Sequence, residues 1–145
     1  MTSEFEQDLA TNREALASAR AELLDALAPL ADADLERGKR GGWTVGRVLD
    51  HVIQSEWLYA RLIAHLRDLP VQGDVVSGVL SSIDDARARL DASRAALLHA
   101  LEGVGEEAFY RLREVGHEEY SILSVLENTA MHDHEHADQV RGIAG

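Results

Sequence analysis

Three histidines fall within five positions near the carboxyl end of the chain, at 132, 134 and 136. On an α-helix, His132 and His136 would lie ~40° apart around the axis and ~6 Å apart along it. Such an i, i+4 pair commonly offers two imidazole nitrogens to one metal ion. His132 and His136 would both lie on the buried face of the helix, whereas His134 would point ~160° from the midline of the pair, toward solvent. The alternative is that His132 and His136 are buried core residues whose nitrogens are satisfied by hydrogen bonds.

His51 is the candidate third ligand. It lies about six residues into a second expected helix, and it borders the same apolar face as Val48 and Leu62. If that helix is an antiparallel neighbour of the last one, His51 and His136 both fall ~9 Å from the same end of the bundle. Three histidines with open coordination positions are typical of a catalytic metal site rather than a structural one.

Two polar residues, Asn128 and Gln139, share the face of His132 and His136. They are candidate hydrogen-bond partners that would fix the imidazole tautomers. They could equally be polar residues at an end of the bundle. By the same helical geometry Asp133 points to another face, and Glu56, ~140° from His51, is expected to be solvated.

The remaining histidines carry weaker signals. His65 follows His51 by fourteen residues, and ~21 Å along a helix is too far for the same ion. His99 is expected late in a helix, where a cation suits the helix dipole. His117 lies in a link of uncertain structure, and surface positions are expected for all three.

Four stretches with helical periodicity must position these residues. Ser3 is expected to cap a first helix over about 4–31, unless Pro29 ends or bends it early. Thr44 would cap a second helix that stops at Pro70. A third helix begins at Ser82 or Asp84 and ends before Gly103, and the fourth runs from a cap at Ser121 to about Arg141.

The links between these helices bear on topology. Residues 70–82 read as a loop long enough to let the third helix run parallel to the second. Residues 106–120 are mixed and could form a short extended piece or an irregular link. The pattern predicts an all-α four-helix bundle around one core, as a single domain over 1–145.

Composition excludes several classes of protein. The 145 residues carry a net charge of −12, which disfavours nucleic acid and anionic lipid as partners. The absence of Cys excludes disulfides, thiolate metal sites and a cysteine nucleophile. The start, Met1–Glu6, is acidic and unlike a signal peptide, and no apolar run approaches ~18 residues, so a cytoplasmic protein is expected.

Several short motifs together resemble the DinB-like superfamily of YfiT-type four-helix bundles. These are Gly42-Trp43-Thr44-Val45 opening a helix, His51 eight positions after Trp43, and a last helix carrying His132, Asp133, His136 and Gln139. The order and separation of these motifs carry the resemblance, which extends over almost the whole chain in helix count, loop placement and length.

The resemblance implies zinc or nickel held by His51, His132 and His136, an up-down-down-up helix order, and a homodimer. Some members of the family are transferases or isomerases that use a low-molecular-weight thiol such as bacillithiol or mycothiol. In the mycothiol-dependent maleylpyruvate isomerase branch the middle ligand is Glu. Because this chain has His132 there, it looks more like the all-His branch.

Three functions are consistent with these observations. The first is a metal-dependent enzyme that presents a thiolate or an activated water to a small-molecule substrate, as a thiol S-transferase or a related transferase, isomerase or hydrolase. The second is a non-catalytic stress protein that binds a metal or small ligand. The third is a structural bundle whose histidines are satisfied within the core, and it alone predicts stability that is indifferent to chelators.

Overall fold

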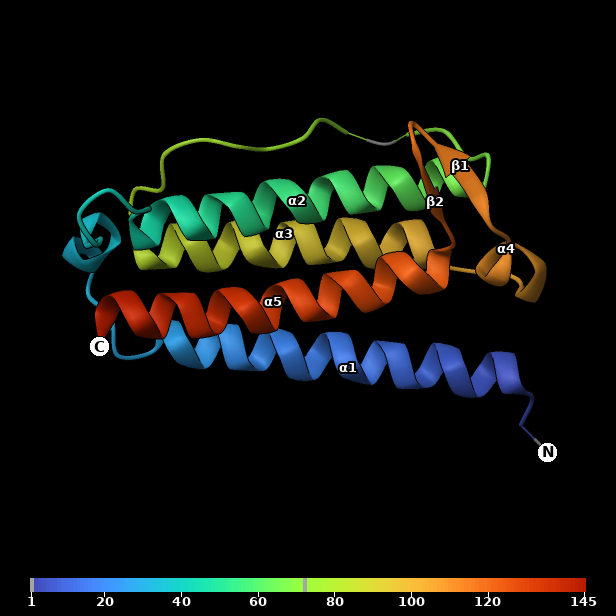
Figure 1. Cartoon of the computed structure of the whole chain (residues 1–145), viewed down its shortest axis with the longest axis horizontal. Helices are drawn as coiled ribbons and strands as arrows, with labels where there is room; N and C mark the ends of the chain where they lie inside the picture. The colour runs from blue at the N-terminus through green and yellow to red at the C-terminus, as the bar shows by residue number, and fades with distance from the viewer. Residues whose placement is uncertain (1, 72) are drawn as a thin grey trace.

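Four long helices form the body of the molecule in the computed structural model, which describes residues 2–71 and 73–145. They are α1 (Glu4–Leu27), α2 (Val45–Leu66), α3 (Ile83–Leu101) and α5 (Ile122–Ala144). Helices α2 and α3 run in one direction, and α1 and α5 run in the other (Figure 1). The predicted four-helix bundle with up-down-down-up order is therefore confirmed. Two positions discussed above, Met1 in the acidic start and Gln72 in the expected loop, lie outside the described residues.

Hydroxyl side chains cap the start of every long helix. The side chains of Ser3, Thr44, Ser82 and Ser121 each accept a hydrogen bond from the backbone N–H three residues later, over 2.9–3.1 Å. Each of these bonds satisfies one of the N–H groups that the first helical turn leaves without a partner. All four caps were predicted, with Ser82 chosen over Asp84 for α3.

The helix ends differ slightly from expectation. Helix α1 stops at Leu27 rather than near residue 31, with Ala28 as its C-cap. Pro29 explains the early end: Ala28 still has helical geometry, but proline has no backbone N–H to donate the next hydrogen bond of the helix. A short 3-10 helix, η1 (Asp32–Glu36), follows. At the other end of the chain, α5 continues three residues past Arg141, to Ala144.

The link over 106–120, left open by the sequence, forms two small elements. A one-and-a-half-turn helix, α4 (Glu106–Tyr110), is followed by a hairpin of β1 (Arg113–Val115) and β2 (Glu118–Tyr120). The strands pair antiparallel with Val115 opposite Glu118. The turn between them uses Gly116 at φ 66°, a conformation that glycine adopts without steric cost.

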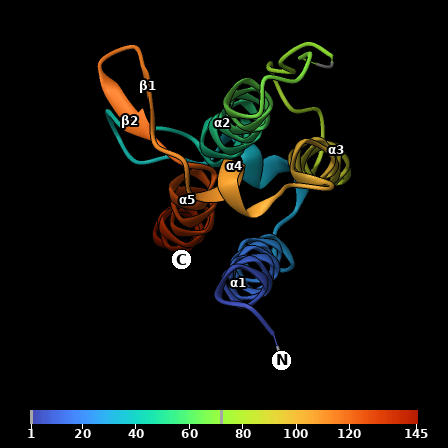
Figure 2. The same cartoon turned by 90° about the vertical axis from the view of Figure 1, so that its right-hand side faces the viewer.

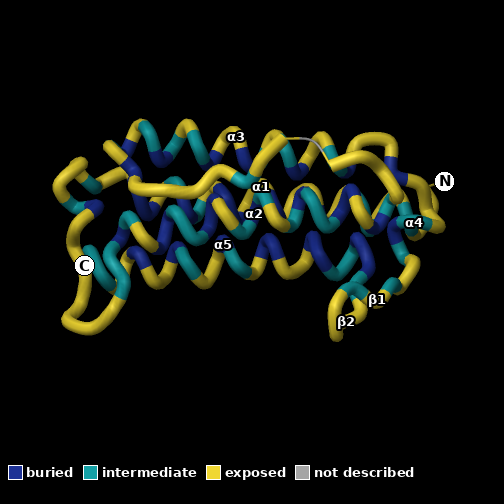
Figure 3. Tube along the Cα trace, turned by 90° about the horizontal axis from the view of Figure 1, so that it is seen from above, coloured by how far each residue is buried: buried dark blue, intermediate teal, exposed yellow. Residues whose placement is uncertain are grey.

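The crossover between α2 and α3 runs along the outside of α2 and is largely exposed (Figures 1 and 3). Asp50 on α2 ties it down: its carboxylate accepts hydrogen bonds from Gly78 N at 2.8 Å and from Ser77 Oγ at 3.1 Å. The long loop spans the whole length of the bundle, which is why α3 can start again at the same end as α2.

Seen along the bundle axis, the four long helices occupy the corners of a square, with α5 next to both α1 and α2 (Figure 2). The interior holds two clusters of buried apolar side chains, one around Leu27, Leu49 and Val140 and the other around Leu16, Ile63 and Phe109. Within the described residues, no helix is long and apolar enough to cross a membrane.

A buried polar network connects all four long helices. Arg20 on α1 and Arg94 on α3 each form ion pairs with Glu56 on α2 and Asp133 on α5 at 2.7–3.0 Å. Glu56 and Asp133 are only 2% and 1% exposed. The prediction that Glu56 is solvated is therefore wrong. Asp133 does point to another face than His132 and His136, as predicted, but that face is the buried one. The two guanidinium groups balance the two carboxylates, so burial of these charges is compensated.

Candidate metal centre

Three histidines from two helices converge at the interface of α2 and α5. Nε2 of His132 lies 3.2 Å from Nε2 of His51 and 3.0 Å from Nε2 of His136. The three potential ligand atoms all lie within 4.8 Å of one another. The structure thus brings together the residues that the sequence singled out as candidate ligands.

The local sequence explains this convergence. On α5, His132 and His136 are one turn apart, and the residues that follow them, Asp133 and Ala137, are buried. On α2, His51 is followed by buried Val52. Because these neighbours are buried, each helix is held in one rotation about its own axis. The histidines therefore lie beside the interface of α2 and α5 and face each other across it.

The histidines are half-buried rather than part of the core. The expectation that His132 and His136 are buried needs this correction, and its physical reason is the charge network. Asp133 occupies the inward-facing position on α5. The buried face of this helix is therefore centred closer to Asp133 than to His132 and His136, and the two imidazoles lie at the edge of the contact between α2 and α5. A group bound between the three nitrogens would therefore have protein on one side and solvent access on the other.

Electrostatics favour the neutral, ligating form of His132 and His51. Burial, followed by the proximity of His136 and His51, lowers the pKa of His132 to about 4. Burial and His136 also lower the pKa of His51, although Asp50 opposes the shift. Neutral imidazoles keep the nitrogen lone pair that a metal requires, so at neutral pH His132 and His51 are ready to bind a cation.

Gln139 and Asn128 differ in their environment. Gln139 Oε1 lies 2.7 Å from Nδ1 of His136. A carbonyl oxygen can only accept a hydrogen bond, so this contact places the proton on Nδ1 and leaves the Nε2 lone pair facing the other histidines. Asn128 is exposed, one turn before His132, and its side chain forms no hydrogen bond within the described part of the chain.

The other four histidines are exposed. His134 points away from the site, as expected, and pairs with Glu22 on α1. Nδ1 of His99 lies 3.6 Å from Oε2 of Glu102 at the end of α3. His65 and His117 also lie on the surface, in keeping with the expectation that these histidines do not take part in the site.

Two aromatic rings and a guanidinium border the histidines. Trp43 packs against His51 with ring centroids 5.2 Å apart, and Tyr59 approaches His132 at 6.1 Å. Arg47 stacks over the Trp43 ring at 4.6 Å. Burial, followed by the charge of Glu135, raises the pKa of Tyr59, so its phenol stays protonated at neutral pH.

No role was predicted from the sequence for Arg47 or Tyr59. A signal was nevertheless present. Trp43, Arg47, His51 and Tyr59 are separated by multiples of four residues, and residues four apart are neighbours on a helix surface. Arg47 lies one turn before the candidate ligand His51 and Tyr59 lies two turns after it, so their spacing alone indicates that they share its side of α2.

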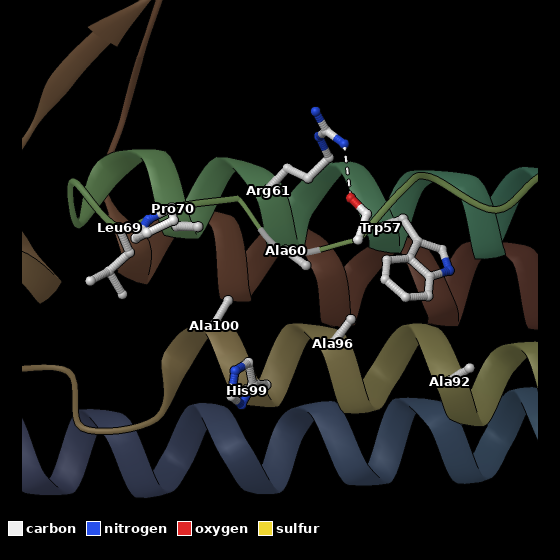
Figure 4. A pocket seen from close by; sticks show the side chains of 11 residues that line it. Trp57, Ala60, Arg61, Leu69, Pro70, Ala92, Ala96, His99 and Ala100 are labelled. Carbon is white, nitrogen blue, oxygen red and sulfur yellow. Dashed lines mark hydrogen bonds between the residues drawn. The ribbon is translucent and has the colours of Figure 1, made fainter.

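A cavity of about 470 Å³ lies elsewhere, between α2 and α3 beneath the crossover. Figure 4 shows Ala60, Ala96 and Ala100 facing each other across it, with Trp57 and Leu69 toward its ends. The cavity exists because alanines on both helices leave the space unfilled. None of the three clustered histidines lines it, so it is separate from the candidate metal centre.

Comparison with known proteins identifies the fold and the family. A protein-family model described as the DinB superfamily matches residues 15–140. The crystal structure of TT2238, described as a four-helix bundle protein, superposes with a TM-score of 0.70 and 24% sequence identity, covering 91% of this chain and 96% of that one. No curated protein sequence matches the chain.

Proposed function

This chain belongs to the DinB superfamily, and from that premise we propose that it is a metal-dependent enzyme. In this proposal His51, His132 and His136 hold one zinc or nickel ion. The reaction is the transfer of a low-molecular-weight thiol to or from a small-molecule substrate, or a related isomerisation or hydrolysis.

The observation that carries the proposal is the convergence of three Nε2 atoms from two helices. Separations of 3.0 and 3.2 Å are close to the ~3.3 Å between ligand atoms around a tetrahedral ion with bonds of ~2.0–2.1 Å. In a metal-free protein the same arrangement is costly, because the lone pairs of neutral imidazoles repel one another wherever no proton lies between them. A cation relieves that repulsion at all three nitrogens.

The chemistry of the donor set also fits. Three neutral imidazoles leave open positions on a bound ion, as catalytic zinc sites do. When bound, the metal supplies a lowered pKa for a coordinated thiol or water, which makes a nucleophile available near neutral pH. The half-buried position of the histidines leaves the approach from solvent open.

Residues of the chain itself orient the site. Gln139 accepts the Nδ1 proton of His136 and so fixes its tautomer. Trp43 and Tyr59 pack beside His51 and His132 and restrict the rotation of their rings. Because the chain has no Cys, any thiolate at the metal must come from a bound small molecule. A thiol-dependent reaction at this site therefore requires a small-molecule thiol as co-substrate.

The proposal extends to the setting of the protein. We place it in the cytoplasm, as a homodimer, with small molecules rather than nucleic acid or membrane as partners. The net charge of −12 supports the exclusion of nucleic acid, since phosphates would be repelled.

The first test is a metal analysis of untagged protein by mass spectrometry after exposure to zinc and to nickel. About one ion per chain is expected, and it should be lost in His51→Ala and in His132→Ala. His134→Ala is the matched control, because His134 lies on the same helix but faces away from the site, and it should retain the ion. A metal-free wild type, or variants that keep their metal, would overturn the site.

A second test separates the enzyme from a non-catalytic metal- or ligand-binding stress protein, which is the alternative function. The metal-loaded protein is incubated with a thiol and an electrophilic acceptor, and thioether formation is compared with that of His132→Ala. Acceleration that requires the histidines supports the enzyme. Metal binding without any acceleration across thiols and acceptors would favour the alternative.

A further inference from the structure

The candidate metal centre is bordered by a basic segment in an otherwise acidic chain. Residues 37–47 contain four of the 14 basic residues and none of the 26 acidic ones. The rest of the chain is correspondingly more negative than the overall charge of −12 suggests. Arg37 pairs with Asp34, just outside the segment, at 3.4 Å, which leaves Lys39, Arg40 and Arg47 as the basic residues that border the helix carrying His51.

The backbone of this segment presents its basic side chains to solvent. Gly42 N donates to Lys39 O at 2.8 Å, and Gly41 adopts φ 77°, so residues 39–42 form a tight turn. Gly38 pairs with Thr44 across the base of the turn. Lys39 and Arg40 are exposed at its tip, and no carboxylate within the described residues forms an ion pair with either of them.

Arg47 connects the basic segment to the histidines. It lies one helical turn before His51, and its guanidinium stacks over Trp43, which in turn packs against the His51 ring. Stacking on an indole restricts the guanidinium plane while leaving the N–H edges free to donate. Among the described residues, no carboxylate pairs with Arg47, and the nearby Asp50 is already bonded to Ser77 and Gly78.

We propose that the substrate of this site carries a carboxylate, which Arg47 binds with a paired hydrogen bond while the reacting end of the molecule lies at the three histidines. Lys39 and Arg40 draw the anion toward the site. A guanidinium suits this role because its planar donors match the two oxygens of a carboxylate. In a protein of this net charge, a local positive field is also needed to bring an anion close. The inference rests on the proposed function for the position of the reacting end, but the anion site itself consists of residues outside the ligand set.

The main experiment measures binding to the cobalt-substituted protein, in which a coordinated thiolate gives a charge-transfer absorption band. The probes are matched pairs: 3-mercaptopropionate against 2-mercaptoethanol, and 6-mercaptohexanoate against 6-mercaptohexanol. At least one acid is expected to bind about tenfold more tightly than its neutral partner, with an advantage that shrinks as salt is added. Arg47→Gln should remove the advantage, and Arg13→Gln, an exposed arginine on α1, should keep it.

If cobalt or the thiols fail to bind, that result counts against the proposed metal-dependent function and not against the carboxylate site. A second measurement then tests the carboxylate site without metal or thiol. In a Trp57→Phe background the indole N–H of Trp43 is the only indole signal in the NMR spectrum. Propionate should shift this signal in the metal-free protein, whereas propionamide should not, and Arg47→Gln should abolish the shift. Equal binding of acids and neutral partners in the first experiment, or equal shifts with propionate and propionamide in the second, would overturn the carboxylate site.

Discussion

Arg20 and Asp133 form an ion pair in the interior of the bundle, with Arg20 Nε donating to Asp133 Oδ2 over 3.0 Å. Asp133 immediately follows His132, so one residue of α5 points into the charge network while its neighbour faces the candidate metal centre. Arg94 Nη2 donates to the same oxygen at 2.9 Å. The position of the histidines is thereby coupled to contacts from α1 and α3.

Replacing Asp133 with Asn should destabilise the protein strongly. The change leaves two buried guanidinium groups facing one fewer carboxylate, and loss of one partner from a buried ion pair typically costs about 3–5 kcal/mol. Urea unfolding followed by circular dichroism would measure the effect. Asp138→Asn, an exposed position on the same helix, should change stability by less than about 0.5 kcal/mol. Similar effects for both variants would show that the network does not stabilise the fold.

Much of the architecture could be predicted from local sequence. Ser3, Thr44 and Ser121 identify helix starts because a cap depends on only three or four neighbouring residues. The four-residue spacing of His132 and His136 is equally local, since any helix places such a pair on one side. The length of the crossover indicated that α3 could run parallel to α2, and the structure confirms this direction.

What could not be predicted depends on distant residues. Asp133 is buried because Arg20 lies opposite it, and these residues are 113 positions apart. Glu56 is buried for the same reason, because Arg20 on α1 and Arg94 on α3 donate hydrogen bonds to its carboxylate. The sequence of a single helix does not indicate that a carboxylate will meet such partners, so a carboxylate is predicted to lie on the solvent-exposed face. The strands over 106–120 are only three residues long, and pairing rather than intrinsic propensity decides their conformation.

Stability of the metal-free protein should fall as the pH is lowered from 7 toward 4. The folded-state pKa of His132 is lowered to about 4, whereas an unfolded histidine titrates near 6.5. Between these values the unfolded chain binds more protons than the folded one, so acid favours unfolding. His51 contributes in the same direction because its pKa is also lowered.

Urea midpoints at several pH values, in the presence of a chelator, would measure this dependence. His132→Asn should flatten the slope between about pH 6.5 and 4, because the titrating group is gone. His65→Asn removes an exposed histidine from α2 and should leave the slope unchanged. If His132→Asn followed the wild-type curve, the acid sensitivity would have to arise from other groups.

Gln139 should contribute to metal affinity, whereas Asn128 should not. Gln139 accepts the Nδ1 proton of His136 at 2.7 Å, and loss of such a partner typically weakens metal binding about 10–100-fold. Gln139→Leu is therefore expected to raise the zinc dissociation constant by that factor in a competition assay with a chromophoric chelator. Asn128→Leu should have little effect, because Asn128 is exposed and makes no side-chain hydrogen bond among the described residues. Equal losses in both variants would contradict the assignment of the tautomer to Gln139.

The cavity between α2 and α3 should accept a larger side chain where the packed core does not. Ala96 borders the cavity of about 470 Å³, whereas Ala86, also on α3, is fully buried among apolar side chains. Ala96→Leu adds apolar contacts in open space and should be neutral or stabilising by up to about 1 kcal/mol. Ala86→Leu forces three extra carbons into a filled interior and should cost about 1–3 kcal/mol. Both changes lie outside the histidine cluster, so zinc affinity should stay within about twofold of wild type in Ala96→Leu. A large destabilisation by Ala96→Leu would mean that the alanines of α2 and α3 pack more closely in solution than the cavity implies.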